Sequence, residues 1–327
     1  MIRRNLLFVF LSLALPTLAL PTSARAQAEY PARAVRVVVP YPPGGNADII
    51  ARLMADQFSK LWNNPVVVDN RAGAGGTVGT DHVAKAAADG YTLLLATIAP
   101  NATAPSIFPN LPYDPVKDFA YIAPLTFAPS VLVVTPSLPV KNVSELIAYA
   151  RANRGKLNYS SPGVGITNHL AMELLLTAAG IEALHVPYKG SNQASAAVVS
   201  GEVQMTIDPV SSSASFIKSG AVRPLAVSGR TRAALLPDVP TMAEAGIRGV
   251  EAYTWTGLAA PAGTPAAIVA KVGRAAMAIL KRPEMRDRMN TMGAEAVDMS
   301  PDQFQAFIRS EAQKWGDIAR RVGAKPQ

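Results

Sequence analysis

The sequence predicts an α/β protein. Short apolar runs of the kind that form buried strands alternate along the chain with segments whose apolar residues have helical spacing. Turns that contain glycine follow several of these runs and precede helical segments, as they do where a strand leads into a helix. About 300 residues follow the first 26, which is more than one small core needs, so two domains are expected.

The expected elements of the first half alternate in type. Strands are expected at 35–39, 66–68, 91–96, 121–125 and 131–134. Helices are expected from about Asp48, over 81–88, and up to Ala152 with Ser144 as the N-terminal cap. Residues 100–118 contain five prolines, so a loop is expected there.

The second half repeats this pattern and adds a return strand. Strands are expected at 157–160, 184–186, 203–207, 222–227 and 255–260. A helix is expected over 168–179, another ends near Gly201, and two helices finish the chain. The last helix carries an apolar face that indicates core packing, made of Phe304, Phe307, Ile308, Trp315 and Ile318.

The first 26 residues have the three parts of an export signal. Arg3 and Arg4 form a basic start, residues 6–20 an apolar core, and residues 24–26 a small-residue cleavage site. We expect cleavage after Ala26 and a periplasmic location. A membrane anchor is the alternative, but the apolar run is short for a bilayer span.

The composition limits the classes of function. The chain holds 31 Lys and Arg against 23 Asp and Glu, a net charge of +8. Removing residues 1–26 takes away three of the basic residues and no acid, which leaves +5. This charge favours anionic solutes, but no block of Lys or Arg indicates nucleic-acid binding. The chain contains no Cys, which excludes disulfides and thiolate chemistry.

Three glycine-containing junctions are the candidate binding loops. The longest is 69–79, and the others are 42–45 and 162–165. Glycine lets the backbone approach a ligand closely, and the first N–H groups of a helix have no partner within it, so such a junction can hold an anion. Each junction can equally be an ordinary turn.

The motifs of nucleotide binding and of catalysis are missing. In G-x-G-x-x-G the third glycine would fall on Val78 in one junction and on Asn168 in another, and no P-loop occurs. His82, His169 and His185 lack metal-ligand spacing, and no nucleophile elbow or triad order is visible. We therefore predict no cofactor, no metal and no catalytic residue. His169 lies near the start of its helix, where we expect it to brace the turn.

Polar side chains at the predicted strand ends complete the candidates. Ligands of open α/β sheets bind beyond the carboxyl ends of the strands. Ser160 and Thr167 could donate hydroxyls to a carboxylate, and Asp208 could accept from a ligand hydroxyl or amine. Each of these side chains can equally serve a turn or a cap.

Several segments together resemble the Bug receptors, the extracytoplasmic solute-binding proteins of tripartite tricarboxylate transport systems. The matching segments are Tyr41-Pro42-Pro43-Gly44-Gly45 with Asp48, 70–79, 89–94, 185–190 and 201–208. The resemblance covers essentially the whole chain after the signal, and its motifs are specific in combination.

The resemblance implies a type II periplasmic-binding-protein fold, in which two α/β lobes around a central cleft are joined by crossover strands. One lobe would comprise 27–127 and 255–327, and the other 128–254. The lobes would close on a small organic acid and deliver it to a membrane permease complex, with no chemistry performed, and we expect a monomer. The alternatives are an exported hydrolase-like enzyme and a receptor that feeds a signalling partner.

The resemblance also implies which residues bind the acid. Main-chain amides and hydroxyls would hold the carboxylates, partly through ordered water at the first loop, and the residues are Tyr41, Gly44, Gly45, Gly75, Gly76, Thr77, Gly163, Gly165, Ile166 and Thr167. The family usually has Ser or Thr where this chain has Ile166. An isoleucine there favours a more apolar or aromatic acid.

Overall fold

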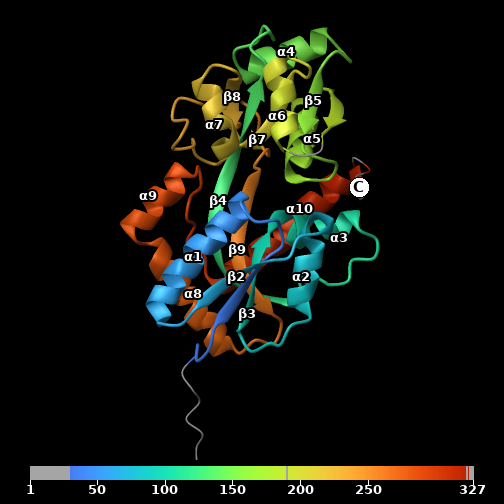
Figure 1. The fold of residues 1–327 in the computed structure, drawn as a ribbon. Helices are drawn as coiled ribbons and strands as arrows, with labels where there is room; N and C mark the ends of the chain where they lie inside the picture. Colours follow the sequence, from blue (N-terminus) through green and yellow to red (C-terminus); the bar gives the residue numbers. More distant parts are fainter. Residues whose placement is uncertain (1–29, 189–190, 322, 324–327) are drawn as a thin grey trace, which may run out of the picture.

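The computed structural model describes residues 30–188, 191–321 and 323, so the expected signal segment and its cleavage site lie outside the described residues. Figure 1 shows two lobes, one above the other in this view. Two long strands, β4 (Phe119–Val134) and β9 (Tyr253–Pro261), run from one lobe toward the other. None of the described helices combines the length and the apolar character that crossing a membrane requires.

The lower lobe in Figure 1 is built on strands in the order β2-β1-β3-β9-β4. β1 (Val35–Val39) is parallel to both β2 (Val66–Asn70) and β3 (Thr92–Thr97), while β9 pairs with β3 antiparallel. Four of the five residues of β1 are buried, as expected for a parallel strand covered on both faces. The helices around this sheet are α1 (Asn46–Trp62), α2 (Thr77–Ala84), α8 (Ala266–Leu280), α9 (Pro283–Thr291) and α10 (Pro301–Arg321).

The upper lobe continues from the far end of β4. The strand order is β4-β7-β5-β6, and β8 (Arg223–Val227) pairs with β4 as well. β5 (Asn158–Ser161) is parallel to both β6 (Leu184–Pro187) and β7 (Met205–Pro209). The helices of this lobe are α4 (Val143–Ala152), α5 (Thr167–Ala179), α6 (Ser191–Ser200) and α7 (Val210–Lys218).

Strand β4 belongs to both lobes. Residues 119–129 pair with β9, and residues 130–134 pair with β7 and β8. Fifteen of its sixteen residues are buried. Both extended segments expected here, 121–125 and 131–134, are confirmed, and the residues between them belong to the same strand. The register with β9 shifts on either side of Pro124, so the strand continues past this proline. The expected lobe boundaries after residues 127 and 254 stay a prediction.

A buried carboxylate connects α10 to the crossover. Glu311 Oε2 accepts a hydrogen bond from Trp255 Nε1 at 3.3 Å and from Trp315 Nε1 at 2.7 Å. Both tryptophans are fully buried, and Phe304 and Phe307 pack edge-on against Trp255. The apolar face expected on the last helix is thus confirmed as core.

Residues 100–118 contain more structure than the expected loop. A π-helical turn spans Ala99–Thr103, and helix α3 follows at Ala104–Ile107. Asn101 is fully buried there and its Oδ1 accepts the Thr97 N–H at 3.1 Å, so this turn is held from inside the protein. Proline is tolerated in a first helical turn because no N–H partner is needed, which is why these prolines do not prevent the turns.

Two further local expectations are wrong. Helix α4 is capped by Asn142, whose Oδ1 accepts the Glu145 N–H at 2.9 Å, and not by Ser144. Three helices finish the chain instead of two, because Pro283 starts α9 shortly after α8 ends.

Gly79 allows α2 to pack closely against two neighbouring loops. A Cβ added at Gly79 would lie 2.6 Å from the carbonyl oxygen of Arg71 and 2.9 Å from Cα of Pro40. Both atoms are backbone, so no side-chain rotation can relieve these contacts. The close approach of α2 therefore requires glycine at this position.

Gly79→Ala should lower the free energy of unfolding by about 2 kcal/mol, because overpacked contacts against backbone force the helix away. The matched control is Gly273→Ala in α8, where the nearest atom to the added Cβ lies at 3.4 Å. This control should be neutral or stabilising, since alanine is favoured over glycine within a helix by about 1 kcal/mol. Urea unfolding measures both changes, and equal effects of the two substitutions would contradict the packing argument.

Candidate functional site

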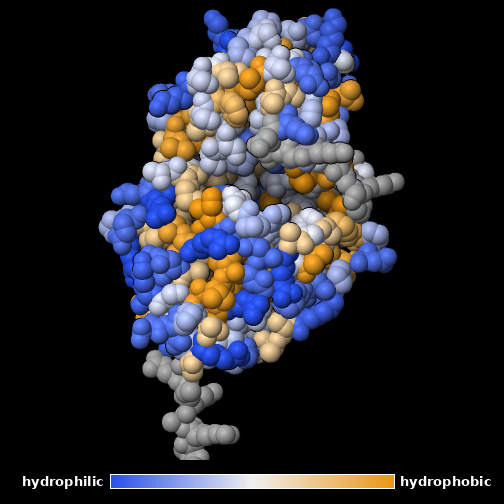
Figure 2. Space-filling view, viewed as in Figure 1, coloured by the Kyte–Doolittle hydropathy of each residue, from blue (hydrophilic) through white to orange (hydrophobic). Residues whose placement is uncertain are grey.

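Several helices begin where a parallel strand ends. α1 follows β1, α2 follows β2, α5 follows β5 and α7 follows β7. In Figure 1, α1 begins on the side of the lower lobe that faces the upper lobe, and Figure 2 shows the surface hollowed between the lobes. No side chain caps these helices, which are preceded by Gly45, Gly76, Ile166 and Pro209. Uncapped first-turn N–H groups can bind an anion.

A buried aspartate holds the loop between β1 and α1. Asp48 is 3% exposed and accepts the Gly44 N–H at 2.9 Å. Arg52 Nε and Asn70 Nδ2 each donate to its carboxylate at 2.9 Å. The bond from Arg52, more than any other interaction, lowers the pKa of Asp48 to about 2, so the carboxylate is ionised at neutral pH. Asn70 also donates to the Tyr41 carbonyl, which ties the loops after β1 and β2 together.

The predicted ligand contacts on the first loop differ in availability. Gly44 and Gly45 are exposed, and an added Cβ at either would meet no atom within 4 Å. The Tyr41 hydroxyl forms a hydrogen bond with the Thr97 hydroxyl at 3.0 Å. Burial raises the pKa of Tyr41, so the phenol stays neutral. This loop therefore has open space beside its glycines, while the Gly44 N–H is bonded to Asp48 and the neutral Tyr41 hydroxyl to Thr97.

The loop before α2 is turned by glycines. Gly75 and Gly76 have φ values of 64° and 97°, a region that L side chains rarely adopt. Thr77 donates its N–H to the Ala74 carbonyl, and its hydroxyl donates to the same oxygen at 2.9 Å. In this conformation the Thr77 hydroxyl is thus bonded within its own loop, whereas the backbone at Gly75 has open space beside it.

Two stacked histidines support the loop between β5 and α5. The rings of His169 and His185 lie 4.0 Å apart with a 9° angle between their planes, and Tyr159 stacks on His185 at 4.8 Å. His169 Nδ1 accepts the Gly165 N–H at 3.0 Å. The prediction that His169 braces the turn is therefore confirmed.

The second histidine acts through a serine. His185 Nε2 lies 2.6 Å from Ser161 Oγ, and that hydroxyl donates to the Gly163 carbonyl at 2.7 Å. Burial lowers the pKa of both His169 and His185 to about 4, with the neighbouring His185 as a second cause for His169. Both rings are thus neutral at neutral pH, as His169 must be to accept a hydrogen bond at Nδ1.

The first turn of α5 has unused donors. Among the described residues, no acceptor bonds the backbone N–H groups of Thr167, Asn168 and His169. Ile166, which precedes the helix, has no side-chain acceptor that could cap them. Three N–H groups at the start of a helix of thirteen residues therefore remain for an anion.

Asp208 lies beside this turn. It is the second-last residue of β7, is 3% exposed, and its Oδ1 accepts from Asn168 Nδ2 at 2.7 Å. Its Oδ2 is buried and has no hydrogen-bond partner among the described residues. Burial raises the pKa of Asp208 to about 6, against the smaller lowering effect of the Asn168 bond.

Comparison with known proteins identifies the family. A model of the tripartite tricarboxylate transporter family receptor matches residues 50–324. The chain belongs to this family. BugT of Bordetella pertussis is 37% identical to it over 323 residues, which cover 98% of each chain.

Two solved structures are similar to this tripartite tricarboxylate receptor. An R. palustris protein solved with adipate is 37% identical, with a TM-score of 0.79, over 91% of this chain and 100% of that one. MatC from Rhodopseudomonas palustris, with bound malate, is 34% identical, with a TM-score of 0.74, over 88% and 99% of the two chains. The expected fold of two α/β lobes joined by crossover strands is confirmed.

Some predicted site residues of this family receptor are engaged within their own lobe. Ser160 is fully buried and its hydroxyl donates to the Ala194 carbonyl at 2.8 Å, so it does not face a ligand in this conformation. The Gly165 N–H is taken by His169, and the Gly163 N–H donates to Ser161 Oγ at 3.2 Å. These groups shape the loop, whereas the open donors belong to the first turn of α5.

Sequence reasoning missed two residues of this site. Asn168 sits in the first turn of α5, where a polar side chain can reach the neighbouring strand end, and it bonds Asp208. His185 pairs in register with Tyr159 across β5 and β6. Because paired residues share a face of a sheet, this pairing could have placed His185 under the loop had the strand register been known.

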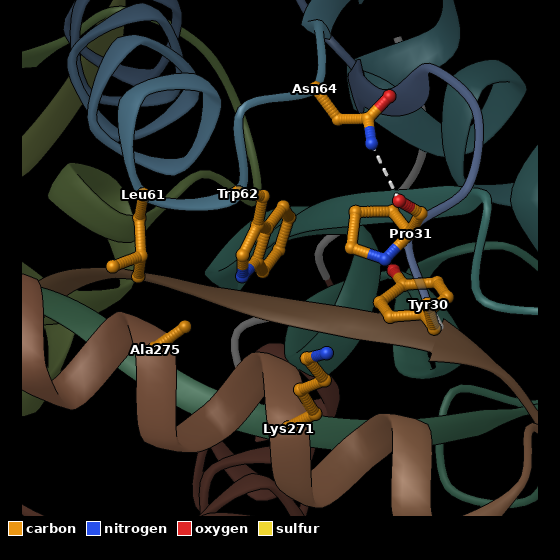
Figure 3. A pocket seen from close by; sticks show the side chains of 7 residues that line it. All are labelled: Tyr30, Pro31, Leu61, Trp62, Asn64, Lys271 and Ala275. Atoms are coloured by element: carbon orange, nitrogen blue, oxygen red, sulfur yellow. Dashed lines mark hydrogen bonds between the residues drawn. The ribbon is translucent and has the colours of Figure 1, made fainter. Parts of the chain in front are cut away.

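A separate cavity lies at the amino ends of strands in the lower sheet. It has a volume of about 520 Å³ and is shown in Figure 3; its lining residues are Tyr30, Pro31, Leu61, Trp62, Asn64, Lys271 and Ala275. Tyr30 and Pro31 precede β1, and Asn64 precedes β2. The cavity thus lies at the amino ends of these strands, away from the helix starts, and we do not assign the acid site to it.

The stability of this tripartite tricarboxylate receptor should depend on the two histidines. Their pKa values are about 4 in the folded protein and 6.5 for an unperturbed imidazole, so the unfolded chain binds more protons between these values. Stabilisation that is present above pH 6.5 is therefore lost as the pH falls toward 4. His169→Asn keeps a side-chain acceptor for the Gly165 N–H, and it should reduce the proton uptake on unfolding by about one between pH 6 and 4.5.

Urea unfolding of the parent protein and of His169→Asn between pH 4.5 and 6 measures how steeply the free energy of unfolding changes with pH. The raised pKa of Asp208 changes the pH dependence of stability in the opposite direction to the histidines. The parent protein and the variant both contain Asp208, so its contribution cancels in the comparison. His82→Asn on α2 is the control and should change the slope less. An unchanged slope in His169→Asn would count against the buried neutral histidine.

Proposed function

We propose that the protein is a periplasmic solute-binding receptor that captures a small organic acid by closure of its lobes and delivers it to a tripartite tricarboxylate-type membrane transporter. The observation that carries this function is the set of three unbonded N–H groups at the uncapped start of α5. Family membership and the adipate and malate bound by two similar structures support it.

The proposed carboxylate site uses backbone donors from both lobes. The upper lobe contributes the first turn of α5 with Thr167. The lower lobe contributes the loop at Gly75 and Gly76, in which the Gly75 N–H is the open donor because the Gly76 N–H donates to the Gly73 carbonyl at 2.9 Å. Tyr41, Gly44 and Gly45 lie on the adjacent loop and are proposed to contact the acid partly through water. Hydrogen bonds to a charged group contribute about 1.5–3 kcal/mol each, so a few give roughly micromolar affinity, near −8 kcal/mol.

Ile166 is proposed to select the apolar part of the ligand. It lies directly before the open N–H groups of α5 and is only partly buried. A side chain at this position adjoins the carboxylate that these N–H groups are proposed to bind. Isoleucine can pack against the apolar part of the ligand but cannot form a hydrogen bond with it. The preferred ligand is therefore an acid with an aliphatic or aromatic body.

The proposal also includes export with cleavage after Ala26, a monomer, lobe boundaries near residues 127 and 254, and no enzymatic activity. A signalling partner in place of a permease would use the same closure. Binding would favour the closed form because only that form brings donors of both lobes to the acid.

A thermal-shift screen of the mature protein against small carboxylic acids tests the function. A few acids should raise the unfolding temperature and be recovered unchanged, since a ligand that binds only the folded state stabilises it by an amount that grows with the logarithm of its concentration over its dissociation constant. Sulfonates and amines of similar size serve as controls. Conversion of a stabilising acid into product would refute the receptor, as would a screen in which no acid stabilises the protein.

Ile166→Ser should shift the preference toward more polar acids. The change removes apolar contact worth about 1 kcal/mol and adds a hydroxyl, so the ratio of adipate to malate affinity should fall about fivefold. Ile166→Val keeps an apolar side chain and should preserve the order of ligands. Calorimetric titration gives both ratios, and an unchanged ratio in Ile166→Ser would remove Ile166 from the specificity argument.

A further inference from the structure

Asp208 is an unusual group to find beside a carboxylate site. One of its oxygens is bonded to Asn168, the residue whose own N–H is among the open donors of α5. The other oxygen is buried and has no partner among the described residues. An ionised carboxylate in this position would lie close to a second negative charge whenever an acid is bound.

No described cation compensates Asp208. The elements packed against β7 are β4, β5, α5, α6 and α7. The titratable side chains that their described residues carry are Tyr121, Tyr159, His169, Glu173 and Lys218. None of these bonds Asp208, and only burial and the Asn168 bond perturb its titration. Tyr159 donates to Glu173 and His169 accepts from Gly165, so these groups are engaged elsewhere.

We propose that capture of an organic acid in this cleft is coupled to the uptake of one proton by Asp208. The inference rests on the proposed function. Two carboxylates that share a poorly solvated site cannot both stay ionised at low cost, so the buried one takes a proton from solvent as the ligand enters. Oδ2, an acceptor without a donor in the free protein, then becomes an O–H donor. Oδ1 continues to accept from Asn168.

The free protein is poised for this step. Burial holds the pKa of Asp208 at about 6, so most molecules are ionised at pH 7 and can still take up a proton there. Every additional pKa unit caused by the bound acid increases the protonated fraction. A rise of one unit gives an uptake of about 0.4 proton per ligand at pH 7, and a larger rise gives more.

Calorimetric titration of the mature protein with adipate, malate and benzoate measures the coupling. Each acid is titrated at pH 7 in several buffers that differ in ionisation enthalpy, none of them a carboxylate or phosphate. These acids are ionised at pH 7 and take up no proton themselves. The dependence of the observed heat on the buffer should give at least about 0.3 proton taken up per ligand. The uptake should vanish by pH 9, where the affinity should be at least about fivefold weaker than at pH 6.

Asp208→Asn keeps the shape of the side chain and an oxygen for Asn168, and it should bind the same acid with no proton uptake. The matched control is Asp56→Asn, an exposed partner of Lys60 on α1, which should leave the uptake unchanged. Should Asp208→Asn fail to fold, Asp208→Ser provides the second variant.

The outcomes separate the two proposals. Binding by the parent protein without proton uptake at pH 7 overturns the coupling and leaves the receptor function intact. Uptake that persists in the Asp208 variants overturns the assignment to Asp208. Failure of the parent protein to bind any of these acids, together with a negative thermal-shift screen, overturns the receptor function and the coupling with it.

Discussion

Both lobes depend on one shared strand. β4 pairs with β9 over its first eleven residues and with β7 and β8 over its last five, so a single buried element fixes where the lower sheet ends and the upper sheet begins. Glu311 adds a second constraint, because it bonds a tryptophan on β9 and another on α10. The two lobes are therefore connected through this buried crossover, and bending there is the motion by which we propose that the receptor closes.

The two lobes fix the loops of the proposed site with ionisable side chains in opposite states. In the lower lobe, Asp48 must be charged to accept from Gly44, Arg52 and Asn70, and the bond from Arg52 keeps it so. In the upper lobe, His169 must be neutral to accept from Gly165, and burial keeps it so. Both loops are thus preorganised near neutral pH, and this lowers the entropic cost of ordering them around a ligand.

The sequence predicts the class of fold well because strands and helices have distinct apolar periods, and glycine marks the junctions between them. It fails where a neighbour distant in sequence decides the outcome. Asn142 and Ser144 are both capping residues, and only the packing of α4 selects the first. Ser160 and Ser161 point to opposite faces of one strand, and which face meets Ala194 depends on a helix thirty residues away. The same limit hides His185, which reaches the loop only through the pairing of β5 with β6.

Among the described residues, the arginines nearest the lower loops are already paired, Arg52 with Asp48 and Arg71 with Asp69. The proposed site attracts an acid with neutral backbone dipoles, and the net positive charge of the chain acts at longer range. Neutral donors bind a carboxylate less tightly than a buried arginine would, so release to a membrane partner requires less energy. The buried carboxyl group of Asp208 beside these donors also favours release, because its ionisation repels the bound acid. A receptor that gains a proton with its solute would therefore release both together.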